Sequence, residues 1–86
     1  MVPFSRQAPR LQRVVRQTAT ENGKQADISF SGVEAELDRN VLERMTAPLE
    51  HLLRNSVVHG IETPEERIKR GKRITGEIKI DLHREG

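Results

Sequence analysis

The sequence contains no cysteine, tryptophan or tyrosine, and its two phenylalanines are Phe4 and Phe30. The lack of cysteine excludes disulfides, thiolate metal sites and cysteine nucleophiles, and it is common in cytoplasmic proteins. No apolar run approaches the roughly 18 residues of a membrane-spanning helix, and the N-terminus lacks the apolar core of a signal peptide. We therefore expect a soluble, cytoplasmic protein with no segment inserted in a membrane.

Hydrophobic residues are also scarce, at 34% of 86 residues, against 33% charged residues. A chain of this length forms one domain at most and buries a modest fraction of its surface. The thin core that results suggests a piece of a larger domain. The net charge is +2, and residues 1–24 hold five basic residues against Glu21 alone, so the basic character is local.

The spacing of apolar residues predicts an α/β architecture. A 3.6-residue period with Pro9 near its start predicts a helix over residues 7–22. Alternation of polar and apolar residues predicts strands over 25–31 and 76–83. We expect these strands to pack under the helices in a two-layer α/β sandwich.

Asp38 has a side chain that commonly caps a helix, which predicts a helix beginning at Arg39. Pro48 lacks an N–H group and clashes with the preceding turn. Residues 38–59 are therefore either one kinked helix or two consecutive helices, with Thr46 capping the second. The first part is predicted to bury three apolar residues: Val41, Leu42 and Met45.

A capping box of Thr63 and Glu66, with proline between them at the first helical position, predicts a short helix that ends at Gly71. Gly60 is predicted to supply the left-handed residue that ends the preceding helix. Residues 84–86 resemble the beginning of a hairpin turn.

Residues 48–62 combine two helical faces. His51, Asn55 and His59 share one side, together with Val58, and they present polar groups at four-residue steps. The other side is predicted to pack on the core and consists of Leu49, Leu52, Leu53, Ser56 and Val57.

The polar stripe suggests a ligand site. His51 and His59 lie about 12 Å apart along a helix axis, too far to share a zinc ion bound at about 2 Å. The amide oxygen of Asn55 is instead a natural ligand for Mg²⁺, which is often shared with nucleotide phosphates. His51 can accept a proton one turn earlier, and Arg54 is a candidate phosphate partner. A solvated polar face, with an ordinary surface arginine, is the alternative.

The arginines between Arg6 and Arg16 offer a second hypothesis, which is nonspecific binding of nucleic acid. It predicts salt-sensitive retention on DNA. However, no base-stacking aromatic residue accompanies these arginines and the overall charge is small. We therefore favour a protein without a nucleic-acid partner.

Residues 48–62, Pro-Leu-Glu-His-Leu-Leu-Arg-Asn-Ser-Val-Val-His-Gly-Ile-Glu, resemble the N box of CheA-type histidine kinases, the ATP-binding helix of the Bergerat (GHKL) fold. The resemblance runs forward to the strand beginning at Gly76 and back to residues 9–11. The start, residues 2–6, is similar to the CheA-like hybrid kinases of type IV pilus chemosensory systems. The resemblance implies that residues 1–86 are the N-box half of one ATP-binding domain, without its G1, lid and G2 regions.

The resemblance also implies a role for each polar residue. Asn55 matches the ligand of magnesium in Mg-ATP, and His51 matches the histidine near the ion, where related ATPases carry a general base. Arg54 and His59 match residues that border the phosphates. The family transfers phosphate from ATP to a histidine of a phosphotransfer domain, and from there to a response regulator, with a CheW-like adaptor and a receptor as further partners.

One position departs from the family pattern. Val58 stands where the family usually has aspartate, in an Asp-His-Gly run. The alternative to a kinase is therefore a docking or scaffold module with a degenerate N box. We also expect the 86 residues alone to be inactive, and to self-associate or swap domains through an exposed strand edge and apolar surface.

Overall fold

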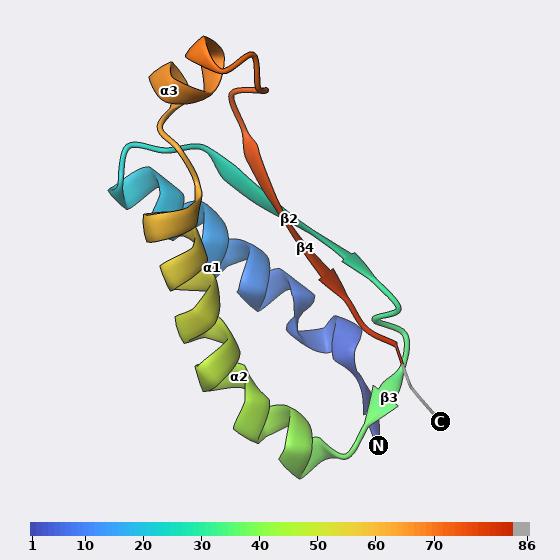
Figure 1. The fold of residues 1–86 in the computed structure, drawn as a ribbon. Coiled ribbons are helices and arrows are strands. Elements are labelled where there is room, and N and C mark those ends of the chain that lie inside the picture. The colour runs from blue at the N-terminus through green and yellow to red at the C-terminus, as the bar shows by residue number, and fades with distance from the viewer. Residues whose placement is uncertain (84–86) are drawn as a thin grey trace.

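The structure, a computed structural model, describes residues 1–83 (Figure 1). Two long helices lie beside a pair of long strands, and short elements connect them. In chain order the elements are β1 (Val2–Pro3), the 3₁₀ turn η1 (Phe4–Gln7), α1 (Ala8–Glu21), β2 (Ala26–Ser31), β3 (Glu36–Leu37), α2 (Arg39–Asn55), the π-helical turn η2 (Ser56–Gly60), α3 (Pro64–Lys69) and β4 (Gly76–Asp81).

The strands form two small sheets. β2 and β4 pair in parallel, with a register that runs from Ala26 opposite Gly76 to Ser31 opposite Asp81. β1 and β3 pair antiparallel, with Val2 opposite Leu37 and Pro3 opposite Glu36. Helix α1 packs against both β2 and α2, so the predicted two-layer α/β fold is confirmed (Figure 1).

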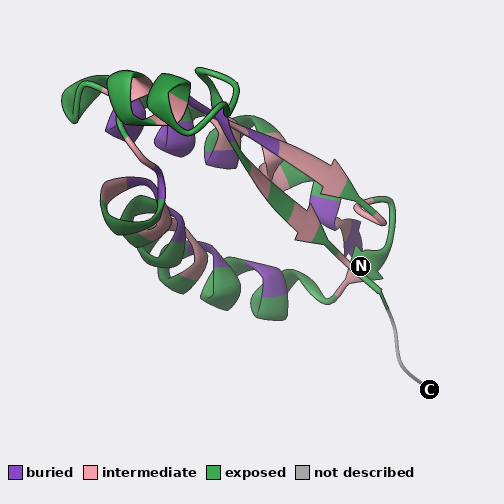
Figure 2. Cartoon of the chain, turned by 45° about the horizontal axis from the view of Figure 1, so that its top comes forward, coloured by how far each residue is buried: buried purple, intermediate pink, exposed green. Residues whose placement is uncertain are grey.

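One hydrophobic core joins the helices to the β2–β4 sheet. In Figure 2 the buried residues lie on the surfaces that the helices and strands turn toward one another. The side chains of Phe4, Leu11, Val15 and Val57 are almost completely buried. Burying a side chain of this kind contributes about 1.5–3 kcal/mol. The core thus fixes both the start of α1 and the end of α2.

Most predicted boundaries are confirmed to within a residue or two. Asp38 caps α2, because its carboxylate accepts hydrogen bonds from the backbone N–H groups of Asn40 and Val41 at 2.9 and 3.3 Å. The Thr63 hydroxyl accepts from the N–H of Glu66 at the start of α3. The predicted turn at 84–86 lies outside the described residues. No helix of residues 1–83 is long and apolar enough to cross a membrane.

Pro48 does not divide the second helix. α2 is continuous from Arg39 to Asn55, with Pro48 inside it and exposed. Thr46 therefore caps nothing, and its buried hydroxyl instead donates to the carbonyl of Leu42 within the same helix at 2.9 Å. Of the two alternatives left open by the sequence, one helix is the outcome.

The predicted core face of α2 is wrong at three positions. Val41, Met45 and Leu52 are 47%, 39% and 60% exposed, whereas Leu42 and Leu53 are buried. The apolar residues of α2 span more of its circumference than α1 and the sheet cover. The helix therefore carries an exposed apolar surface beside its buried one.

Gly60 does not adopt the predicted left-handed conformation. Positive φ angles occur at Gly23, Gly32 and Gly71 among the described residues. The chain leaves α2 through the π-helical turn η2 and becomes extended at Ile61, so no left-handed residue is needed there. Ile61 is buried against Gly76, where an added Cβ would lie 2.7 Å from an Ile61 methyl carbon.

Candidate functional site

The C-terminal end of α2 holds the predicted polar stripe on a well-anchored support. Leu53 and Val57 are buried in the core on one side. His51, Arg54 and Asn55 are exposed on other sides of α2, and His59 is exposed in the π turn that follows. Because the buried face fixes the rotation of the helix, it also fixes the side of α2 on which each exposed residue lies.

The polar side chains of the stripe have no hydrogen-bond or ion-pair partner among the described residues. Among residues 1–83, no side chain or backbone group forms a hydrogen bond or ion pair with the side chains of His51, Arg54, Asn55 or His59. The Asn55 carboxamide therefore keeps both its acceptor oxygen and its donor N–H groups for a ligand. An exposed set of this kind is compatible with either ligand binding or a solvated face.

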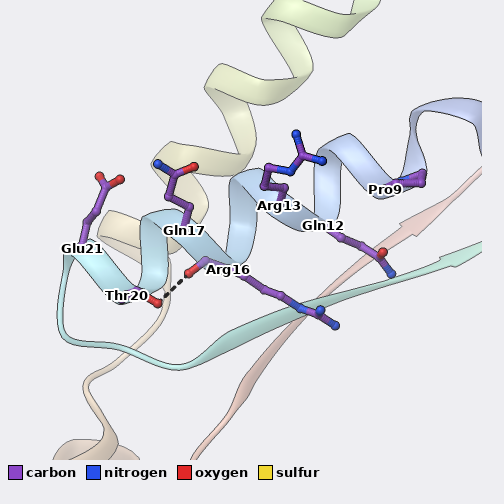
Figure 3. A pocket seen from close by; sticks show the side chains of 7 residues that line it. All are labelled: Pro9, Gln12, Arg13, Arg16, Gln17, Thr20 and Glu21. Carbon is purple, nitrogen blue, oxygen red and sulfur yellow. Dashed lines mark hydrogen bonds between the residues drawn. The ribbon is translucent and has the colours of Figure 1, made fainter.

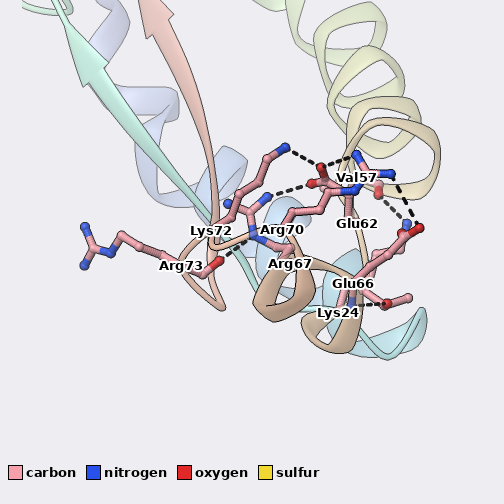
Figure 4. A network of polar contacts seen from close by, with 9 residues as sticks. Lys24, Val57, Glu62, Glu66, Arg67, Arg70, Lys72 and Arg73 are labelled. Carbon is pink, nitrogen blue, oxygen red and sulfur yellow. Dashed lines mark hydrogen bonds and ion pairs between the residues drawn. The ribbon is translucent and has the colours of Figure 1, made fainter.

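The backbone changes its hydrogen-bond pattern immediately after Asn55. Residues 56–60 form a π-helical turn, a rare conformation that is frequent at functional sites. The Ser56 hydroxyl donates to the carbonyl of Leu52 at 3.0 Å. Lys24 reaches the same turn from the loop after α1. Its ammonium donates to the carbonyl of Val57 at 3.0 Å (Figure 4) and to the carbonyl of Val58 at 2.7 Å.

The site offers few protein ligands for a metal ion. Within the described part of the chain, no three His, Cys, Asp or Glu side chains come close enough to hold an ion together. The metal ligand that the sequence predicts on the stripe is the amide oxygen of Asn55. This donor set fits Mg²⁺, which keeps several waters and is commonly bound through one or two protein ligands plus phosphate oxygens.

A charged network follows the stripe. Glu62 accepts hydrogen bonds from Lys72 and from Arg67, the latter at 2.7 Å, and Arg70 lies at 3.5 Å (Figure 4). The Glu62 and Arg67 side chains are only 15% and 14% exposed. The Lys72 hydrogen bond first, then the backbone N–H of Glu62 and the charges of Lys72 and Arg67, lower the pKa of Glu62 to about 2.

Curated proteins are similar in sequence to this chain, although no protein-family model matches it. Over all 86 residues, the chain is 40% identical to the chemotaxis protein CheA of Salmonella typhimurium and 41% identical to CheA of Bacillus subtilis. It is 38% identical over the same length to the protein named sensor histidine kinase CheAY of Helicobacter pylori. The chain is similar to one segment of CheA. It spans 13%, 13% and 11% of these three proteins.

The similarity supports the relation to CheA-type histidine kinases that residues 48–62 predicted. Two structural features of this CheA-like segment were not predicted from the sequence. One is Lys24, whose side chain meets residues 33 and 34 positions away, at a distance that no local pattern reveals. The other is the role of Glu62. The sequence holds a signal for it, because five basic residues occur between 67 and 73, but basic residues at a helix end are equally explained by the helix dipole.

The arginines of the alternative nucleic-acid hypothesis lie on α1 and its entry. Arg16 pairs with Asp27 of β2 at 3.3 Å, and Arg10 pairs with Glu50 of α2. Figure 3 shows Arg16 extending toward the strands while Arg13 points to another side of α1. These arginines thus do not form one basic surface. Only Arg13 and Arg16 of this group border a shallow depression of about 680 Å³, whose other lining residues are Pro9, Gln12, Gln17, Thr20 and Glu21 (Figure 3).

Proposed function

We propose that this chain is the N-box part of a CheA-type histidine kinase and that it binds Mg-ATP through the stripe at the end of α2. The observation that carries the proposal is the Asn55 carboxamide, which is exposed on a firmly packed helix and has no partner among residues 1–83. It occurs in a chain whose 86 residues are 40% identical to a segment of CheA from Salmonella typhimurium. A Bergerat-type ATP-binding domain is the fold that this proposal implies.

In this proposal each polar residue keeps the role that the resemblance implies, and its chemistry suits that role. The amide oxygen of Asn55 ligates Mg²⁺, whose charge offsets that of the phosphates. His51, one turn earlier on α2, accepts a hydrogen bond or a proton from a water near the ion. Arg54 and His59 flank Asn55 and donate hydrogen bonds to phosphate oxygens. The catalytic power of such a site comes from positioning and charge neutralisation.

The complete protein, in this proposal, transfers phosphate from ATP to a histidine of a phosphotransfer domain, which passes it to a response regulator. A CheW-like adaptor and a receptor are the expected partners, in the cytoplasm, and a type IV pilus system is the proposed setting. Because the chain spans 13% of the length of its first relatives, we expect the 86 residues alone to bind ATP weakly and to be catalytically inactive.

Val58 supports a second candidate function. It stands on the stripe at a position where the CheA-type family, which this sequence resembles, usually has an acidic residue. The Val58 side chain is half-buried and has no polar group for a ligand. A docking or scaffold module would keep the fold and lose nucleotide binding. Absence of any Mg-ATP binding would favour this function.

The test is an NMR titration of the isotope-labelled chain with Mg-ATP at millimolar concentration, repeated with paramagnetic Mn²⁺ in place of Mg²⁺. We expect Mn-ATP to broaden the side-chain amide signals of Asn55 and the ring signals of His51 and His59. The Asn40 amide, at the other end of α2 and about 22 Å away along the axis, should stay sharp.

The matched variants are Asn55→Ala and Asn40→Ala, which remove the same exposed side chain from the two ends of one helix. Loss of even an outer partner of a metal ligand weakens metal binding by about 10-fold to 100-fold. We therefore expect Asn55→Ala to weaken Mg-ATP binding at least about tenfold. Asn40→Ala should bind like the unchanged chain, and equal affinity in both variants would remove the role of Asn55.

A further inference from the structure

Lys24 connects the end of α1 to the end of α2. Its ammonium donates to the carbonyl oxygen of Val57 at 3.0 Å (Figure 4). It also donates to that of Val58 at 2.7 Å, and both bonds are partly buried. These carbonyls belong to the π turn between Asn55 and His59. A side chain far away in the sequence therefore holds the backbone segment that joins two residues of the proposed site.

The carbonyls of this turn need such a donor. The last carbonyls of a helix have no partner within the helix, and a change from α to π pattern displaces the hydrogen bonds further. These groups also carry the partial negative charge of the helix C-terminus, which favours a cation. A lysine ammonium provides three donors and no acceptor, so it can bind both oxygens at once.

The position of Lys24 is itself fixed by the end of α1. Gly23 has a φ of +65°, and its N–H donates to Thr20, while the N–H of Lys24 donates to the carbonyl of Ala19 at 2.8 Å. This pair of bonds is a Schellman motif, with glycine at the left-handed position. The Cα of Lys24 therefore has a defined place, from which its side chain reaches η2.

We infer that Lys24 is a positioning residue for the proposed nucleotide site. It acts through the π turn, because it fixes the backbone of residues 57 and 58 and thereby the relative placement of Asn55 and His59. It has no assigned contact with the nucleotide. The inference rests on the proposed function, and it adds a residue outside the N box to the determinants of Mg-ATP affinity.

The experiment compares Mg-ATP binding, by the same NMR titration, in the unchanged chain and in Lys24→Met. The methionine keeps the length of the side chain and removes its donors. We expect binding to weaken at least about tenfold, as for other groups that orient a metal ligand. Lys24→Arg keeps the charge with a different donor geometry and should restore part of the affinity.

Two control variants separate positioning from other effects. Lys79→Met removes one positive charge from the exposed side of β4 and should bind normally. Asp38→Ala removes the cap at the far end of α2, which lowers the stability of the fold without touching η2. If Lys24 acted only on stability, Asp38→Ala would weaken Mg-ATP binding to a similar degree.

The possible outcomes are distinct. Normal binding by folded Lys24→Met would overturn this inference and leave the proposed function standing. No binding by the unchanged chain would overturn both. If Lys24→Met fails to fold, Lys24→Arg decides: weakened Mg-ATP binding with a native spectrum supports the inference, and unchanged binding overturns it.

Discussion

Glu62 is the carboxylate on which the basic residues after the candidate site converge. Arg67 bridges it to the backbone, because the Arg67 guanidinium also donates to the carbonyl of Arg73 at 2.5 Å. The same guanidinium lies beside Gly76, at the start of β4. The network thus ties the end of α2 to β4 across α3. It maintains the segment that follows the stripe.

The low pKa of Glu62 predicts a dependence of stability on pH. The pKa of Glu62 falls from the ordinary 4.5 to about 2 in the folded chain, so the ionised carboxylate stabilises the fold. This contribution is fully present above pH 4.5 and is lost as the pH falls through about 2. We expect Glu62→Gln to lower the urea midpoint most at neutral pH, and the difference from the unchanged chain to shrink between pH 4.5 and 2.

Glu65→Gln provides the control for this measurement, because Glu65 is an exposed carboxylate three residues further along. Its urea midpoint at neutral pH should change much less than that of Glu62→Gln, because the Glu65 side chain has no ion-pair partner among the described residues. A constant difference between Glu62→Gln and the unchanged chain across the pH range would contradict the role of the ionised carboxylate.

The residues of the candidate site differ in how far the sequence could predict them. His51, Asn55 and His59 recur at helical spacing, so their common exposure follows from local periodicity. Lys24 contacts carbonyl groups, and backbone atoms leave no trace in the choice of residues at 57 and 58. Its partner therefore becomes apparent only when the tertiary structure brings the two helix ends together.

At the scale of elements, helix boundaries were predictable where a side chain satisfies the end of a helix. Asp38 and Thr63 act within three residues of their own position, which is why the starts of α2 and α3 were correct. The exposed surface of α2 was not predictable. Apolar periodicity identifies which residues share a face, but it does not tell which part of that face another element covers.

Pro48 provides a prediction about α2. Proline in a helix interior costs about 3 kcal/mol relative to alanine, and it offsets about 1 kcal/mol of this by restricting the unfolded chain. Because Pro48 is exposed and lies inside a continuous helix, we expect Pro48→Ala to raise the free energy of unfolding by about 2 kcal/mol. Urea denaturation followed by circular dichroism measures this change.

Ala47→Gly is the companion variant for this experiment. It alters the neighbouring exposed position of α2 and should lower the stability by about 1 kcal/mol. If Pro48→Ala is no more stable than the unchanged chain, the proline ring makes a compensating contribution in the folded state, and the expectation is wrong.

At the scale of the whole molecule, the chain is more extended than a compact domain of its length. Its radius of gyration is 14.2 Å, whereas about 12 Å is typical for 86 residues. Each of β2 and β4 pairs with a single strand among the described residues. Parallel sheets are usually covered on both faces and extended by further strands. Much apolar and edge surface is therefore open.

An exposed apolar surface on α2 predicts self-association of the 86-residue chain. A groove of about 450 Å³ runs along α2, lined by Val41, Arg44, Met45, Pro48, Leu49 and Leu52. Its residues recur at helical spacing, so the same helix of a second copy can pack antiparallel into it about a two-fold axis. We expect the mass from sedimentation equilibrium to rise with concentration, and Leu52→Glu, at a 60% exposed position, to keep the chain monomeric and folded. Ile74→Glu, on an exposed residue far from the groove, should associate like the unchanged chain. Undiminished association of Leu52→Glu would exclude the groove and implicate the open strand edges, because an added charge on α2 leaves β2 and β4 unchanged.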